Sequence, residues 1–250
     1  MSGMKRLRIF AGPNGSGKST IKGLVADHFK LGIYVNADEM KALAERQSFL
    51  DFSVYGVSLE LADLIRYIQL HPLLKQIGAI DVEKVLYSEA DRLFFIDSQT
   101  IDGYLILIIA DYIRSRLLET AERFSFETVL SNLAKLSFMR EAKARGFKVY
   151  LYFVSLAAPE MNVERVRSRV EQGGHDVPKD KVVDRYYRTM DFLFEAMKIA
   201  DNVYLFDNSY QEPALFAKKE NNILEIVGDK RYVPKWYQDY VLDKLPKNTE

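Results

Sequence analysis

Short runs of apolar residues alternate along much of the chain with longer segments in which apolar residues recur every three or four positions. A short apolar run between turn residues is typical of a strand buried in a parallel sheet, and the longer spacing is typical of an amphipathic helix. Five such runs predict parallel strands over Leu7–Ala11, Gly32–Val35, Arg123–Glu127, Phe147–Val154 and Asn202–Phe206.

The segments between these runs predict the helices that would cover the sheet. They are Ser19–Lys30, Asp38–Gln47, Leu133–Arg145, Pro159–Glu171 and a long helix from Pro178 to about Ala200. Two shorter strands over Ala214–Lys218 and Asn222–Val227 and a helix over Pro234–Leu245 are expected to follow. Regular alternation of strands and helices implies right-handed crossovers. The predicted fold class is therefore α/β, with a central parallel five-stranded sheet flanked by helices, in a single domain of residues 1–250.

The stretch from Leu50 to about Glu122 has a different pattern. It contains long amphipathic segments with almost no strand-like alternation, namely Ser58–Leu70, Asp81–Phe95 and Asp102–Ala121. Breaks are expected near His71-Pro72, at Gly78 and around Ser98–Thr100. We interpret this stretch as three or more helices that follow the second strand.

The composition argues against several classes of protein. The 35 basic residues balance the 35 acidic residues, whereas a nonspecific nucleic-acid binder is usually basic. The absence of cysteine excludes disulfides, thiolate metal sites and thiol catalysis, and only 3 histidines argue against a histidine-rich metal site. The most apolar run, Tyr104–Ala110, is too short to span a bilayer, and the basic residues of Met1–Arg8 are not followed by the long apolar stretch of a signal peptide. We therefore expect a cytoplasmic protein.

The strongest motif lies between the first predicted strand and the first predicted helix. It matches G-x-x-x-x-G-K-[ST] at every fixed position, with Gly12, Pro13, Asn14, Gly15, Ser16, Gly17, Lys18 and Ser19, followed by Thr20. Glycines let main-chain N–H groups turn toward a phosphate, and the helix N-terminus adds the positive end of its dipole. We expect Lys18 to reach the β- and γ-phosphates of ATP and Ser19 to ligate Mg²⁺. The alternative is a glycine turn that binds nothing, and the flanking strand and helix argue against it.

Two carboxylates follow predicted strands, at the edge of the sheet where the glycine-rich loop also lies. Asp38 could accept the proton of an attacking hydroxyl, or it could only cap the next helix. Glu127, which precedes Thr128, could hold the water shell of Mg²⁺ or a substrate hydroxyl, or it could pair with a neighbouring arginine. The residue types leave these alternatives open.

The richest cationic stretch lies beyond the fourth predicted strand. It contains Arg165, Arg167, Arg169, the turn Gly173-Gly174-His175, Arg185 and Arg188. Arg165 and Arg169 are four residues apart and share a helix face, as in a lid that brings charge to the γ-phosphate when it closes. The alternative is a solvated helix whose charge is balanced by Glu164 and Glu171. We interpret Asp207-Asn208-Ser209, after the fifth strand, as a turn in preference to an adenine-binding loop.

Together these segments resemble the zeta toxin family, in its chromosomal branch of predicted ATPases. The matching segments read IFAGPNGSGKST, VNADE, FSFETVLS, GFKVYLYFVSL, ERVRSRVEQGGHDVP, RYYRTMDFLF and YLFDNS. The resemblance implies a P-loop NTPase/kinase fold and a kinase that uses ATP and Mg²⁺. It further implies transfer of phosphate to the 3′-hydroxyl of a sugar nucleotide, UDP-N-acetylglucosamine, and a small helical antitoxin protein as a partner.

The family pattern assigns roles to individual residues of this sequence. Lys18 and Ser19 would bind phosphate and Mg²⁺, and Asp38 would be the general base. Glu127 and Thr128 would lie near the sugar, and Arg165 would contact the phosphates of ATP. The second phosphate-binding arginine has no single match, and Arg169 or Arg185 could serve.

The sequence departs from the family pattern between the second and third strands, where members of this branch have a much shorter connection. Residues 43–101 are therefore expected to form a helical insertion that borders the acceptor site. Two other functions stay open on sequence alone. The protein could be a kinase that acts on another nucleotide or on a nucleic-acid end, which predicts a wider basic groove, or it could be an ATP-hydrolysing regulatory switch that has no acceptor.

Overall fold

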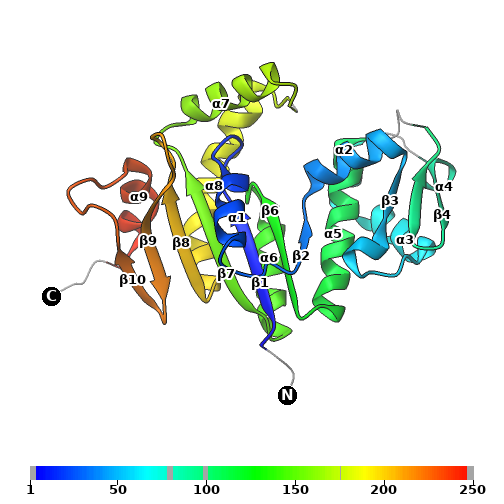
Figure 1. The fold of residues 1–250 in the computed structure, drawn as a ribbon, viewed down its shortest axis with the longest axis horizontal. Coiled ribbons are helices and arrows are strands. Elements are labelled where there is room, and N and C mark those ends of the chain that lie inside the picture. Colours follow the sequence, from blue (N-terminus) through cyan, green and yellow to red (C-terminus); the bar gives the residue numbers. More distant parts are fainter. Residues whose placement is uncertain (1–3, 78–80, 98–100, 175, 247–250) are drawn as a thin grey trace. The chain divides into compact units, whose positions relative to one another are not determined.

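The computed structural model describes residues 4–77, 81–97, 101–174 and 176–246 (Figure 1). The chain forms two compact units. Unit 1 comprises Met1–Leu31 and Glu127–Glu250, and unit 2 comprises Gly32–Phe126. The predicted breaks at Gly78 and Ser98–Thr100, and His175 of the predicted lid, lie outside the described residues. Over the described ranges, no helix is long and apolar enough to cross a membrane.

Unit 1 is built on a sheet whose strands follow the order β10-β9-β8-β7-β1. These strands are β1 (Arg6–Ala11), β7 (Lys148–Ser155), β8 (Asn202–Asp207), β9 (Ala214–Glu220) and β10 (Ile223–Ile226). The strands β1, β7 and β8 are parallel, and β9 and β10 extend the sheet in antiparallel order. Three of the predicted parallel strands and both shorter strands are thus present in unit 1.

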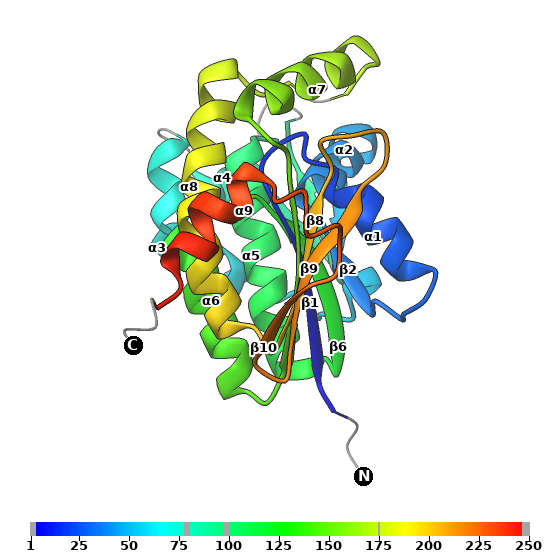
Figure 2. The same ribbon diagram turned by 90° about the vertical axis from the view of Figure 1, so that its left-hand side faces the viewer.

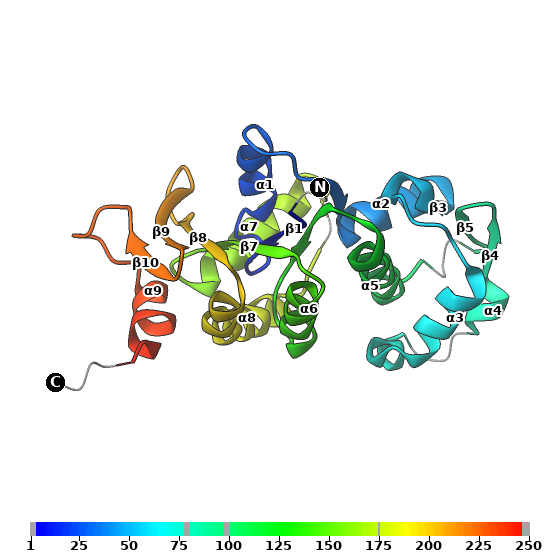
Figure 3. The same ribbon diagram turned by 90° about the horizontal axis from the view of Figure 1, so that it is seen from below.

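Helices cover both faces of this sheet (Figure 2, Figure 3). On one face lies α1 (Lys18–Ala26), and on the other lie α6 (Leu133–Ala144) and α8 (Lys179–Ile199). The chain passes from β7 through α7 (Pro159–Glu171) into α8, and the last elements of the described residues are α9 (Lys235–Tyr240) and a 3-10 turn at Leu242–Lys244. Because both faces are covered, β7 is an almost continuous buried run.

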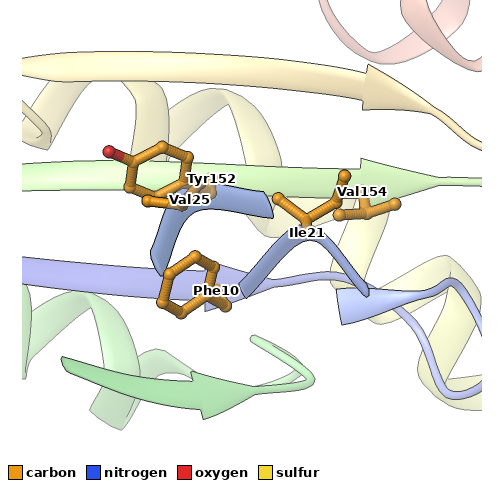
Figure 4. Packing of buried hydrophobic residues seen from close by; sticks show 5 residues of the cluster. All are labelled: Phe10, Ile21, Val25, Tyr152 and Val154. Carbon is orange, nitrogen blue, oxygen red and sulfur yellow. The ribbon is translucent and has the colours of Figure 1, made fainter. Parts of the chain in front are cut away.

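A small apolar cluster fixes α1 against the sheet (Figure 4). Ile21 and Val25 on α1 pack with Phe10 on β1 and with Tyr152 and Val154 on β7. The rings of Phe10 and Tyr152 stack with their centroids 5.1 Å apart. Full burial of an apolar side chain of this size contributes roughly 1.5–3 kcal/mol. The cluster therefore holds the first turns of α1 firmly above the ends of the two strands.

Unit 2 contains a pair of parallel strands and a three-stranded antiparallel sheet. The pair consists of β2 (Ile33–Val35) and β6 (Arg123–Thr128), and the end of β6 belongs to unit 1. The small sheet has the order β3-β5-β4, with β3 (Phe49–Asp51), β4 (Leu86–Glu89) and β5 (Arg92–Phe95). The helices are α2 (Ala37–Gln47), α3 (Leu61–Leu70), α4 (Val82–Val85) and α5 (Gly103–Thr120), with 3-10 helices at Phe52–Tyr55 and Pro72–Gln76.

The expectation of a helix over Asp81–Phe95 is wrong. Helix α4 ends at Val85, and the residues that follow form the antiparallel hairpin β4–β5. Leu93 and Phe95 are buried whereas Phe94 between them is half-buried, which is the period of a strand. The segment over 43–101 therefore contains strands as well as helices. Its boundaries as an insertion within a single domain stay a prediction.

Asp201 links α6, β7 and β8 through hydrogen bonds at the amino-terminal ends of the parallel strands, opposite the glycine-rich loop. Its carboxylate accepts hydrogen bonds from Lys143 Nζ and from the Val149 N–H, both at 2.8 Å. Partial burial alone would raise the pKa of Asp201, but these two hydrogen bonds bring it below its ordinary value. The ionised carboxylate is therefore the form that the fold favours.

We expect Asp201→Asn to lower the free energy of unfolding at pH 7 by about 1–2 kcal/mol, because charge-assisted hydrogen bonds are lost. The folded-state pKa is depressed, so this stabilisation is fully present above the unfolded-state value of about 3.9 and is lost as the pH falls through the folded-state pKa. Urea unfolding of both proteins from pH 7 downward measures the difference. The control is Asp239→Asn, which removes an exposed ion pair with Lys235 on α9. If the difference in unfolding free energy between the unchanged protein and Asp201→Asn does not shrink in acid, the ionised carboxylate is not the stabilising form.

Candidate active site

The glycine-rich loop lies between β1 and α1, in the strand–loop–helix setting that the motif requires. Gly12, Gly15 and Gly17 have φ angles of 149°, 72° and 98°. Residues with a side chain rarely adopt such angles. Gly17 is the N-cap of α1, so the first N–H groups of the helix point back toward the loop. The backbone therefore has the form of an anion-binding site.

Lys18 bridges the two ends of the loop. Its ammonium donates hydrogen bonds to the carbonyl oxygens of Gly12 and Pro13, at 3.0 and 2.9 Å. These contacts hold the cation against the loop. A phosphate at this place would offer charged oxygens, which accept stronger hydrogen bonds than neutral carbonyls do.

Ser19 and Glu127 come together although they are far apart in the sequence. The Ser19 hydroxyl, in the first turn of α1, donates to Glu127 Oε2 near the end of β6 at 3.2 Å. A hydroxyl and a carboxylate are hard oxygen ligands of the kind that Mg²⁺ takes, together with water and substrate phosphate oxygens. The pair therefore fits a Mg²⁺ site beside the loop. The neighbouring Thr128 hydroxyl accepts the Leu130 N–H at 3.1 Å, and Thr20 is exposed on α1.

Two asparagines hydrogen-bond the loop from outside: Asn162, which the sequence did not single out, and Asn208, which it placed in a turn. Asn162 on α7 donates its side-chain amide to the carbonyl of Asn14 at 2.7 Å. Asn208, directly after β8, donates its side-chain amide to the carbonyl of Ser16 at 2.8 Å. Their exposed fractions are 0% and 6%. A signal for Asn162 did exist, because it lies three residues before Arg165 and therefore on the same helix face.

Arg165 is the arginine of the predicted lid that reaches this region. Its Nη2 donates to the carbonyl of Asn208 at 2.6 Å, so it lies next to the residue that holds the loop. Arg169 is half-buried one turn further along α7, where its carbonyl accepts the N–H groups of the helix end. Arg185 is half-buried on α8. The structure thus places Arg165 at the loop and leaves the choice of a second arginine open.

Other arginines of the cationic stretch belong to the solvated surface. Arg167 pairs with Glu164 at 3.2 Å and with Glu171 at 4.0 Å. Arg188 pairs with Asp184 at 3.1 Å on α8. For Arg167 the alternative of a helix surface balanced by Glu164 and Glu171 is confirmed, and Arg188 is balanced by a different carboxylate.

The segment after β8 is a turn, as the sequence indicated. Asp207 Oδ1 accepts both the N–H of Ser209, at 2.8 Å, and its hydroxyl. This Asx turn leaves Asn208 between the two residues with its side chain on the loop. The turn interpretation was therefore right for Asp207, but it gave Asn208 no role.

Asp38 lies in unit 2, in the first turn of α2. The cap of this helix is Asn36, whose Oδ1 accepts the N–H groups of Asp38 and Glu39 at 2.9 and 3.4 Å. The alternative in which Asp38 serves as the cap is therefore wrong. Its side chain is exposed at the start of the helix, so the carboxylate is accessible to a substrate.

No family model matches the chain. A curated relative, an uncharacterized protein of Haemophilus influenzae (strain ATCC 51907 / DSM 11121 / KW20 / Rd), is 36% identical over 63 residues. The match covers 25% of this chain and 45% of that protein. The chain therefore spans less than half of the length of this relative.

Solved structures are similar over nearly the whole chain. A chain of the AvrRxo1-ORF1:AvrRxo1-ORF2 complex with sulphate ions has a TM-score of 0.60 and 16% identity, and the match covers 97% of this chain and 65% of that one. A chain of the same complex with ATP has a TM-score of 0.61 and 15% identity, with coverage of 99% and 66%. This chain spans just under two thirds of those chains. The likeness establishes the fold, an α/β protein with a mostly parallel sheet.

Alanine at Gly17 is expected to disrupt the loop, because its Cβ would lie 2.3 Å from Asn208 Nδ2 and the φ of 98° disfavours any side chain. We expect Gly17→Ala to lower the free energy of unfolding by about 1–3 kcal/mol. The matched control is Gly23→Ala on α1, where a Cβ would meet nothing within 4 Å. That change should stabilise the helix by up to about 1 kcal/mol. Denaturant unfolding measures the change in unfolding free energy for both variants. If both changes have the same sign, the close packing at Gly17 is not what makes glycine necessary there.

Proposed function

We propose that the protein is an ATP-dependent phosphotransferase, a kinase of zeta toxin type that moves the γ-phosphate of ATP to a hydroxyl group of a small molecule. The observation that carries the proposal is the loop between β1 and α1, with Lys18 bound to it and Ser19 3.2 Å from Glu127. These are the groups that grip a polyphosphate and its metal ion in P-loop enzymes. The complex of a structural neighbour with ATP supports the choice of nucleotide.

Lys18 and Arg165 would supply the positive charge. In the structure each donates to main-chain carbonyls, Lys18 to Gly12 and Pro13 and Arg165 to Asn208. In the proposed complex with ATP, each would exchange a neutral carbonyl acceptor for a phosphate oxygen. The exchange is favourable because hydrogen bonds between ionised partners are roughly twice as strong as neutral ones. Lys18 would bind the β- and γ-phosphates, and Arg165 would stabilise the negative charge of the phosphoryl group during its transfer.

Ser19 and Glu127 would hold the Mg²⁺ that accompanies the nucleotide, the serine through its hydroxyl and the glutamate directly or through a water. Mg²⁺, when bound, neutralises charge on the β- and γ-phosphates. The hydrogen bond between the two side chains already positions both oxygens on the same side of the loop.

Asp38 would act as the general base on the acceptor. The acceptor oxygen forms a bond to the γ-phosphorus, the bond from that phosphorus to the bridging oxygen breaks, and the hydroxyl proton passes to the carboxylate of Asp38 while ADP leaves. The exposed position of Asp38 in the first turn of α2 supports this role, since Asn36 already caps the helix.

The acceptor that the zeta toxin resemblance favours is a sugar nucleotide such as UDP-N-acetylglucosamine, with Glu127 and Thr128 near the sugar. The resemblance also favours a small helical antitoxin protein as a partner. The structural neighbours come from a complex of two proteins, AvrRxo1-ORF1 and AvrRxo1-ORF2, which supports the search for such a partner.

We expect the protein to transfer label from γ-labelled ATP·Mg²⁺ to a hydroxyl acceptor. A panel of UDP-sugars, nucleosides, oligonucleotide ends and small-molecule cell extract, resolved by chromatography, should give one new labelled species. Label on a UDP-sugar would identify a sugar nucleotide as the acceptor. Label on an oligonucleotide would show that the acceptor is a nucleic-acid end instead. Release of inorganic phosphate alone, with every acceptor, would refute the kinase and leave an ATP-hydrolysing switch.

Asp38→Asn should lower the transfer rate by about 10²- to 10⁴-fold, because the general base is lost, and it should leave the affinity for ATP unchanged. Glu39→Gln is the matched control, because it removes the next carboxylate in the same exposed turn. Initial rates of transfer and calorimetric titration with ATP·Mg²⁺ measure the two effects separately. Full turnover in the Asp38 variant would remove this residue from the mechanism.

A further inference from the structure

The carbonyl groups of the glycine-rich loop are bound by side chains from distant parts of unit 1. Asn162 on α7 reaches the carbonyl of Asn14, and Asn208 after β8 reaches the carbonyl of Ser16, at 2.7 and 2.8 Å. The pairs are separated by 148 and 192 residues in the sequence. Both asparagines are buried, with exposed fractions of 0% and 6%. Burial shields these hydrogen bonds from competition with water, so each bond constrains the loop strongly.

These two bonds determine the direction of two N–H groups. A peptide group is planar and trans, so its C=O and its N–H point in opposite directions. The carbonyl of Asn14 shares a peptide group with the N–H of Gly15, and the carbonyl of Ser16 shares one with the N–H of Gly17. When each asparagine holds its carbonyl on the outer side of the loop, the N–H of the following glycine is held toward the inner side.

The packing leaves the loop little freedom to turn these peptide groups over. A Cβ on Gly15 would lie 2.9 Å from the carbonyl of Asn162, and a Cβ on Gly17 would lie 2.3 Å from Asn208 Nδ2. The loop therefore lies directly against both asparagines. Glycine at positions 15 and 17 lets α7 and the end of β8 pack against the outer side of the loop. It is therefore needed for this packing as well as for a phosphate on the inner side.

Asn208 also connects the loop to a cation. Its main-chain carbonyl accepts the 2.6 Å hydrogen bond from Arg165, while its side chain holds Ser16. Asn162 lies one turn before Arg165 on α7. The neighbouring Val166 anchors this part of α7, because it packs with Val177, just before α8, and with Val182 on α8. One pair of asparagines thus fixes both the loop and the helix that carries the arginine.

We propose that Asn162 and Asn208 are positioning residues for the phosphate site: they hold the N–H groups of Gly15 and Gly17 toward the nucleotide phosphates and place Arg165 beside them. This inference rests on the proposed function, because it requires nucleotide phosphates to occupy the loop. Neither asparagine needs to touch the nucleotide. The loop is prepared before the nucleotide arrives, and binding does not have to organise it.

The first test compares Asn162→Ala and Asn208→Ala with Asn202→Ala. Asn202 is the matched control, because it lies at the other end of β8 and its side-chain amide bonds Glu220 at 3.4 Å, away from the loop. Calorimetric titration with ATP·Mg²⁺ should show about tenfold weaker binding for each loop variant, as expected for one buried hydrogen bond. Asn202→Ala should bind within about twofold of the unchanged protein. Thermal unfolding of all four proteins shows whether stability changes run parallel to affinity.

The second test reports on individual N–H groups, which a purely structural role would not distinguish. In ¹⁵N–¹H spectra, titration with ADP·Mg²⁺ should shift the amide signals of Gly15 and Gly17 downfield in the unchanged protein. Asn162→Ala should reduce the shift of Gly15 more than that of Gly17, and Asn208→Ala should do the reverse. In the unchanged protein, the side-chain amide protons of both asparagines should exchange slowly with and without ADP, and this measurement decides the matter if a variant does not fold.

Two failures are distinguishable. If the unchanged protein does not bind ATP or ADP, the proposed function fails. If it binds nucleotide but both loop variants bind within twofold of it, or if the asparagine amides exchange rapidly, the positioning role is refuted and the proposed kinase stands.

Discussion

The carbonyl oxygens of the glycine-rich loop impose the constraint on which the arrangement of unit 1 depends. A loop that turns its N–H groups inward leaves its carbonyls outside, and buried carbonyls need hydrogen-bond donors. Asn162 and Asn208 supply such donors to Asn14 and Ser16, and without nucleotide Lys18 supplies one to Gly12 and Pro13. Asn162 brings α7 to the loop, and Asn208 brings the end of β8. The carbonyl oxygens of this short loop need hydrogen-bond donors, and this need brings α7 and the end of β8 next to the loop.

Features with a local cause, or with a cause in a general rule of parallel sheets, could be predicted from the sequence. The loop was recognisable because the motif, the strand before it and the helix after it are adjacent in the chain. Helix α7 was predicted with its observed ends, because a proline begins it and glycines follow it. The meeting of Ser19 and Glu127 followed from a general rule, since residues at the carboxyl ends of parallel strands lie at the same edge of a sheet.

Features that left a weak signal, or a distant one that no general rule covers, could not be predicted. The hairpin β4–β5 was taken for a helix because its turn contains no glycine: Ala90 adopts a φ of 50° and leaves no signal in the sequence. Asn36 and Asp38 are both good caps two residues apart, and only the backbone shows that the helix begins at Ala37. Asn208 looked like an ordinary turn residue, because its partner Ser16 is 192 residues away.

The distribution of charge restricts how an acceptor could be bound. The groups proposed to grip ATP lie in unit 1, whereas Asp38 lies beside Glu39 in the first turn of α2 in unit 2. The N-terminus of a helix favours negative charge, which suits two adjacent carboxylates. The nearest cation along the helix, Lys41, is already paired with Glu45. An acceptor with phosphates of its own would be repelled if they lay close to Asp38. If Asp38 is the general base proposed above, the phosphates of such a molecule would have to be neutralised by cations other than Lys41.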